Sequence, residues 1–148
     1  MAIKIDVGRS TFKELIHEGL YYADRTVFIE RLESIGGSFT YFLRPRRFGK
    51  TLWISTLENY YGLHHKEDFE RTFGHLYIGQ NPTSLASQFL ILKFNFSQID
   101  TRTPEGIFRD FMRNVIVGLN DFSVCYPDLL SEAELAKMSK ADSPTTLL

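Results

Sequence analysis

The sequence predicts an α/β fold in which helices flank a parallel sheet, and three features of the chain lead to this prediction. Two short apolar segments, Phe39–Leu43 and Phe89–Phe96, have the composition of buried strands. A loop with four cationic side chains and then a helix directly follow the first segment. A long amphipathic pattern that starts at Thr103 and Pro104 follows the second. The resulting order of strand, loop and helix is that of a helix-covered parallel sheet.

A helical entry segment is expected over residues 1–37. Thr11 and Glu14 have the spacing of a capping box, which starts a short helix that Gly19 ends. Asp24 is expected to cap a second helix. The core side chains expected on that helix are Val27, Phe28, Leu32 and Ile35, and Gly36 and Gly37 end it.

Further helices are expected along the rest of the chain. One runs over Thr51–Tyr61 and stops at Gly62, and a shorter one covers Lys66–Phe73 before a turn-rich stretch. The long helix after Pro104 is expected to bury Ile107, Phe108, Phe111, Met112, Val115, Ile116 and Leu119. A surface helix over Ser131–Met138 follows, and Ser143 with Pro144 would start one more.

Composition limits the class of protein. The chain has 148 residues, a net charge of −1 and a hydrophobic content of 43%, as expected for one globular domain or part of one. The near-neutral charge provides no general attraction for nucleic acid, so anion binding requires a local cluster. A single cysteine and the lack of a secretory signal or an apolar run of spanning length indicate a cytoplasmic protein that does not enter the membrane.

The chemistry concentrates between Arg44 and Thr51, whose sequence is RPRRFGKT. The phosphate-binding pattern G-x-x-x-x-G-K-[ST] is met at Gly49, Lys50 and Thr51, while Arg44 stands at the first glycine position. In such loops backbone N–H groups and the lysine hold a polyphosphate, and the hydroxyl ligates Mg²⁺. Pro45 has no N–H to offer, and the arginines are expected to compensate with their side chains.

A second interpretation of the same residues stays open. The RPRR cluster is also typical of a solvated basic turn, or of a patch that binds nucleic-acid phosphate, a protein partner or a targeting receptor. Such a patch needs no flanking strand. The expected strand before the loop and the expected helix after it therefore favour the phosphate loop.

Two segments together resemble the AAA-ATPase-like family. They are FKELIHEGLYYADRTVFIERL and FLRPRRFGKTLWISTLENYYG, and the family combines a D-K-T element with an R-P-R-R-F-G-K-[ST] loop; the likeness continues more loosely through FERTFGHLYIG and FLILKFNFS. Here the D-K-T element is Asp24, Arg25 and Thr26, with arginine in place of lysine. Asp24 has two readings, a helix cap or an ion-pair partner of the loop arginines.

The resemblance implies a P-loop NTPase-like fold, ATP as nucleotide and Mg²⁺ as its counter-ion. Lys50 takes the phosphate role and Thr51 the metal role in a variant Walker A loop. The implied nucleotide-binding residues are Arg46, Arg47, Phe48, Gly49, Lys50, Thr51 and Leu52.

One family feature is missing from the sequence. Relatives carry a second acidic motif at the end of an apolar strand. The only comparable segment here is Phe89–Phe96, but Lys93 lies within it and Asp100 lies four residues beyond Phe96. Without that acid, ATP hydrolysis is expected to be negligible, and enzyme status stays open. The nuclease-like C-terminal domain found in many family members is also missing.

Residues 1–148 are therefore interpreted as the N-terminal part of one AAA-ATPase-like domain. They comprise the entry segment 1–37, an α/β nucleotide-binding portion 38–148 and no second domain. The expected partners are a nucleotide and a missing C-terminal half or separate chain, with nucleic acid left open. A truncated remnant, unstable on its own, is the third interpretation.

Overall fold

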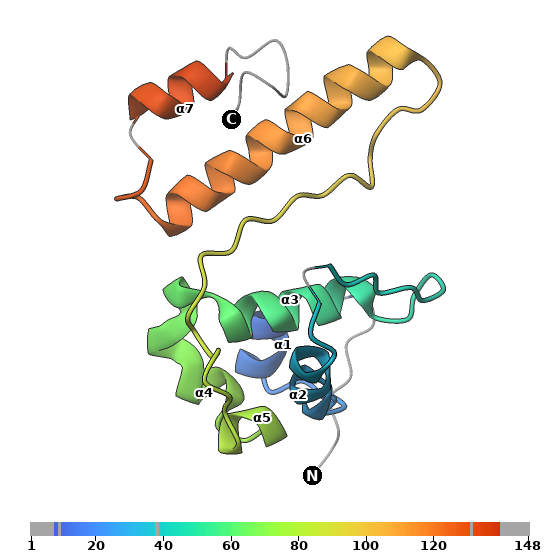
Figure 1. Ribbon diagram of the computed structural model, residues 1–148. Coiled ribbons are helices and arrows are strands. Elements are labelled where there is room, and N and C mark those ends of the chain that lie inside the picture. The colour runs from blue at the N-terminus through green and yellow to red at the C-terminus, as the bar shows by residue number, and fades with distance from the viewer. Residues whose placement is uncertain (1–7, 9, 38, 131, 140–148) are drawn as a thin grey trace. The chain divides into compact units, whose positions relative to one another are not determined.

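The computed structural model describes residues 8, 10–37, 39–130 and 132–139. It divides into two compact units, Met1–Leu90 and Ile91–Leu148. Figure 1 shows the helices of both units, which in chain order are α1 Phe12–His17, α2 Val27–Ser34, α3 Lys50–Tyr61, the 3₁₀ helix η1 Leu63–Asp68, α4 Phe69–Phe73, α5 Tyr77–Gln80, α6 Pro104–Cys125 and α7 Glu132–Ser139. The division at 37/38 between entry segment and nucleotide-binding portion stays a prediction.

The predicted α/β fold is wrong: the described residues form helices and no sheet. Neither expected strand forms, and the one β-type contact in the described chain is an isolated parallel bridge between Gly62 and Phe89. In the first segment Phe39, Tyr41 and Leu43 are 83–88% exposed. Aromatic and branched side chains favour an extended backbone locally, but a strand also needs a hydrogen-bonded neighbour along its length. The second segment finds one only at Phe89.

The first unit folds around an aromatic core. Six buried residues from five segments meet there, namely Phe12, Ile29, Tyr60, Phe73, Leu76 and Ile78. The ring of Phe12 lies 5.0 Å from that of Phe73, and Tyr60 meets Phe73 edge-on at 5.6 Å. Such offset and edge-to-face pairs add to the free energy gained from burying the rings. The core fixes α3 at its C-terminal half, around Tyr60.

The two entry helices, α1 and α2, form where predicted, but their caps and core side chains differ from those expected. Thr11 is the N-cap of α1 but makes no side-chain cap, and Gly19 ends that helix region with φ 65°. The N-cap of α2 is Thr26 rather than Asp24. The core side chain of α2 is Ile29, whereas Phe28 and Ile35 are 45% and 71% exposed.

A carboxylate ties α2 to α3 across the first unit. Glu33 Oε1 accepts hydrogen bonds from the hydroxyls of Tyr61 and Thr83, each at 2.9 Å. The Thr83 hydroxyl also lies 3.0 Å from the Tyr60 hydroxyl. Burial and this carboxylate raise the pKa of Tyr61, so its phenol stays protonated and donating.

The second unit is an extended segment laid along α6. Thr103 caps α6 by accepting the Gly106 N–H, and Pro104 occupies the first turn, both as predicted. Of the expected buried face, Met112 is buried, but Ile107 and Phe108 are 42% and 46% exposed. The Tyr126 hydroxyl accepts the Ile91 N–H at 3.1 Å, which anchors the start of the segment to the end of the helix.

Two further expectations concern the ends of the described chain. Helix α7 matches the predicted surface helix, although its expected cap Ser131 and the start signal at Ser143 and Pro144 lie outside the described residues. Among the described helices, none is long and apolar enough to cross a membrane.

Candidate phosphate-binding loop

The RPRRFGKT segment forms an exposed turn that ends directly in α3. Gly49 is the N-cap residue and has the left-handed φ of 73°, with its C=O accepting the first helical hydrogen bond from Trp53 N–H at 2.8 Å. A β-carbon on Gly49 would meet no atom within 4 Å. Glycine is therefore required here by the backbone angle and not by lack of space.

The loop contains a second left-handed residue, Arg47, with φ 66°. For a residue with a side chain this conformation costs about 1 kcal/mol or more. Two left-handed positions two residues apart turn the chain sharply enough to bring the carbonyl groups at the start of the loop near the start of α3. The loop thus holds some strain in its exposed half.

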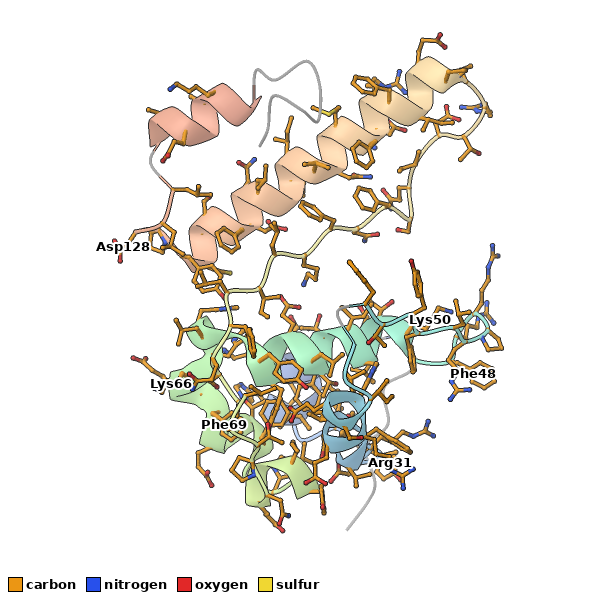
Figure 2. All side chains as sticks on the ribbon, in the orientation of Figure 1. Arg31, Phe48, Lys50, Lys66, Phe69 and Asp128 are labelled. Atoms are coloured by element: carbon orange, nitrogen blue, oxygen red, sulfur yellow. The ribbon has the colours of Figure 1, made fainter. Side chains whose placement is uncertain are left out.

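The N-terminus of α3 has no capping side chain. The N–H groups in the first turn of a helix have no intrahelical partners, and together they carry a partial positive charge. Figure 2 shows Lys50 and Phe48 together at this end of α3. The helix start therefore presents uncapped donors beside a cationic side chain, which is the arrangement that binds anions.

Lys50 closes the loop on itself. Its Nζ donates to the carbonyl oxygens of Arg44 at 2.6 Å and Pro45 at 2.8 Å. The ammonium group is thus held by two neutral acceptors. Pro45, expected only to remove a donor, supplies one of these acceptors, a role that residue type alone does not signal.

The remaining loop side chains point into solvent. Arg44, Arg46 and Arg47 are exposed, and none forms an ion pair with another described residue. The guanidinium of Arg44 lies 5.7 Å from the centre of the Phe42 ring. Phe48 is 66% exposed at the turn. The loop is a concentrated positive surface with one aromatic side chain at its tip.

The last two predicted site residues lie on α3 and differ from each other. Thr51 is exposed in the first turn, one residue after Lys50. Leu52 packs its side chain against the aromatic core of the first unit. Only the backbone N–H of Leu52 is left to take part in anion binding, whereas the Thr51 hydroxyl is accessible.

The Asp24-Arg25-Thr26 element does not reach the loop arginines. Asp24 Oδ1 accepts the N–H and the hydroxyl of Thr26, at 2.8 and 2.7 Å, and its Oδ2 accepts the Tyr77 N–H at 2.8 Å. The Thr26 hydroxyl accepts the Ile78 N–H at 3.1 Å. The element therefore caps the start of α5, and it joins α5 to α2.

The charge state of Asp24 fits this capping role. Desolvation acts to raise its pKa, but the hydrogen bonds from Tyr77 and Thr26 outweigh it and lower the pKa below the ordinary value. The carboxylate is thus ionised when it accepts these donors. No local pattern indicates these partners, because Tyr77 and Ile78 lie about fifty residues further along the chain.

Acidic residues that would complete a metal site are not gathered anywhere in the described chain. It contains no group of three His, Cys, Asp or Glu side chains able to hold a metal ion. Asp100 instead forms a two-point pair with the Arg102 guanidinium, whose hydrogen bonds lower the Asp100 pKa.

Comparison with known proteins gives one result. The family model described as predicted AAA-ATPase matches residues 6–146, which is nearly the whole chain. Searches of curated proteins and of solved structures gave no match.

Proposed function

The chain belongs to the predicted AAA-ATPase family, and from this premise we propose that it binds ATP with Mg²⁺ through Arg44–Thr51 without hydrolysing it by itself. The observation that carries the proposal is the start of α3. There an uncapped helix N-terminus follows a left-handed glycine and carries Lys50 on its first turn. Phosphate is the anion that this combination of donors, dipole and ammonium binds in P-loop proteins.

Binding requires one local rearrangement. In the unliganded loop the Lys50 ammonium is held by the carbonyls of Arg44 and Pro45. A β- or γ-phosphate offers charged acceptors, which form hydrogen bonds about twice as strong as neutral carbonyls do. Lys50 therefore leaves the loop carbonyls for the phosphate, and the turn opens around the ligand.

The exposed arginines and Thr51 determine which nucleotide is preferred. Arg46 and Arg47 have no anionic partner among the described residues, so they add charge that favours a triphosphate over a monophosphate. Thr51 follows Lys50 and supplies the hydroxyl ligand for Mg²⁺. Turnover also needs an acid that positions the metal and the attacking water, and the loop has none beside it in sequence.

Calorimetric titration of Mg²⁺-ATP into the purified chain tests the proposal. The wild type should bind saturably, and Lys50→Ala should bind at least tenfold more weakly, since a charge-assisted hydrogen bond is worth about 1.5–3 kcal/mol. Lys66→Ala is the matched control, because Lys66 lies at the other end of the first unit from Lys50 (Figure 2) and should leave binding unchanged. Circular dichroism verifies that all three proteins are folded.

A basic binding module is the second candidate, favoured by the solvent-facing arginines and by the 66% exposure of Phe48. Nucleic-acid phosphate would then contact Arg46 and Arg47, with a base against the ring. Such binding weakens steeply with salt and does not depend on Mg²⁺. If the folded wild type ignores Mg²⁺-ATP but binds a single-stranded oligonucleotide in this way, the nucleotide proposal is wrong.

A further inference from the structure

A pair of aromatic rings lies beside the phosphate-binding loop. Phe42 stands two residues before Arg44, and its ring centre lies 6.4 Å from that of Trp53, at an angle of 35° between the rings. Trp53 belongs to α3 and also packs against the aromatic core of the first unit, which fixes its position. The pair therefore joins the chain that enters the loop to the helix that leaves it.

Phe42 is covered differently from its neighbours in the entering chain. It is 43% exposed, whereas Tyr41 and Leu43 are 87% and 83% exposed. The contact with Trp53 accounts for this difference, because it covers part of the Phe42 ring. Nearly half of Phe42 still meets solvent. A flat apolar surface is thus held against α3 and remains open at the side of the loop.

The aromatic pair lies about one nucleotide's length from the expected phosphate position. Lys50 and Trp53 are three residues apart on α3, so they are neighbours on the helix surface, with about 5–6 Å between their β-carbons. The Lys50 ammonium contacts the carbonyl of Arg44. Phe42 is two residues from Arg44, a stretch that spans at most about 7 Å. Since a ribose and an α-phosphate separate a base from its β-phosphate, a base can meet Phe42 while Lys50 holds the phosphate.

A guanidinium group also lies at the Phe42 ring. The Cζ atom of Arg44 is 5.7 Å from the ring centre. Arg44 is exposed and forms no ion pair with another described residue. A cation–π contact at an exposed site is weaker than the stacking of a base on an aromatic ring. A base therefore displaces the guanidinium, and Arg44 is then able to pair with the phosphates.

Phe48 is a second exposed ring of the loop, but its position suits a base less well. It is 66% exposed and directly precedes Gly49. Its backbone is part of the turn expected to surround the phosphates, so the ring lies next to the phosphate and not a ribose away from it. Phe42 has the further advantage of Trp53 beside it, which offers a contact to the edge of the base.

We propose that the base of the bound nucleotide stacks on Phe42, with Trp53 at its edge; this inference rests on the proposed function of the loop. Stacking uses the flat face that every base has. Phe42 therefore determines the preference of the site for a nucleotide over a bare polyphosphate, whereas Lys50 binds what the two ligands share.

The fluorescence of Trp53 provides the first test, because Trp53 is the only tryptophan in the sequence. Mg²⁺-ATP should quench this fluorescence saturably when the indole is excited outside the absorption band of adenine. Mg²⁺-tripolyphosphate, which has no ribose or base, should bind in a calorimetric titration without quenching. Its affinity should be about tenfold lower than that of ATP, the loss of one stacking contact.

Three variants separate stacking from folding. Phe42→Ala should bind Mg²⁺-ATP about tenfold more weakly than the wild type and should keep the wild-type affinity for Mg²⁺-tripolyphosphate. Phe42→Tyr keeps a flat ring and should bind ATP as the wild type does. Tyr41→Ala is the matched control, since it removes a ring from the adjacent position and should leave both affinities unchanged. Circular dichroism verifies that all variants are folded.

Several results would overturn the proposal. Equal affinities of the wild type for ATP and tripolyphosphate would mean that the base makes no contact. Loss of both ligands in Phe42→Ala would show that the ring only supports the loop. Weaker ATP binding in Phe48→Ala, with Phe42→Ala unchanged, would move the base to the tip of the loop. Failure of the folded wild type to bind either ligand would instead contradict the proposed function itself.

Discussion

Two helices of the first unit begin in opposite ways. The first two N–H groups of α5 have side-chain acceptors, because Asp24 accepts the Tyr77 N–H and Thr26 accepts the Ile78 N–H. The start of α3 has no capping side chain, although α3 is the longer helix. The N–H groups at a helix start are satisfied by side chains, by water or by a ligand such as an anion. The comparison indicates that the Asp24–Thr26 element serves the fold, and it supports our proposal that the Arg44–Thr51 loop serves a ligand.

The largest expected effect concerns the capped start. Thr26→Val keeps the shape of a side chain that is fully buried but removes its hydroxyl. The Ile78 N–H then loses its acceptor and Asp24 loses a donor. We expect a loss of about 2 kcal/mol in the free energy of unfolding, measured by urea denaturation.

The matching substitution at the loop is Arg46→Ala, at a side chain in open solvent. It should change the free energy of unfolding by less than about 0.5 kcal/mol. Equal losses in the two variants would contradict the assignment of one helix start to stability and the other to binding.

A smaller effect is expected from exchanging residue types at the two left-handed positions of the loop. Arg47→Gly relieves the strain of φ 66° and should stabilise the protein by about 0.5–1 kcal/mol. Gly49→Ala introduces the same strain at φ 73° and should destabilise it by about 1 kcal/mol. The melting temperatures of the two variants should therefore shift in opposite directions. A shift in the same direction would show that φ does not determine the change in stability at either position.

The smallest effect is a pH dependence at the α5 cap. The Asp24 pKa is lowered in the folded chain from its ordinary 3.8. A carboxylate with a lowered pKa stabilises the fold above its unfolded pKa, and this contribution is lost as the pH falls through the folded pKa. Stability should therefore decrease below about pH 4, the ordinary range for Asp.

Asp68, Asp100 and Asp110 also have lowered pKa values and contribute to the same decrease. The share of Asp24 is isolated by comparing urea midpoints at pH 5 and pH 3 for the wild type and Asp24→Asn. The midpoint should fall less in the variant. An identical fall in both proteins would mean that Asp24 is not held as a carboxylate.

Local signals in the sequence locate α1, α2, α3 and α6, but not the short α5, which forms in the stretch expected to be turns. Helix α3 begins within one residue of the predicted start and ends at Tyr61, because Gly49 and Gly62 limit it locally. The long helix α6 follows from its Thr103 cap and Pro104. Caps and glycines act over three or four residues, which is why residue order alone places them.

Features that depend on distant partners cannot be predicted from local patterns. The Phe39–Leu43 and Phe89–Phe96 segments have strand composition, but strand formation depends on a neighbour elsewhere in the chain. Helicity was predicted for α2, yet Ile29 and not Phe28 faces the core, because the core is set by α3 and α4. In the candidate site, Leu52 packs inward and Pro45 supplies a carbonyl to Lys50, and neither detail follows from the motif.

We propose that the N–H groups at the start of α3 are open to a phosphate, whereas those at the start of α5 are capped. The most direct measurement is an NMR titration with Mg²⁺-ATP that follows the backbone amides at both helix starts. We expect large saturable shifts of the amide signals of Gly49, Lys50 and Thr51, and no shift of those of Tyr77 and Ile78. Shifts at Tyr77 and Ile78 with none at the loop, or no shift at either helix start in a folded protein, would contradict it.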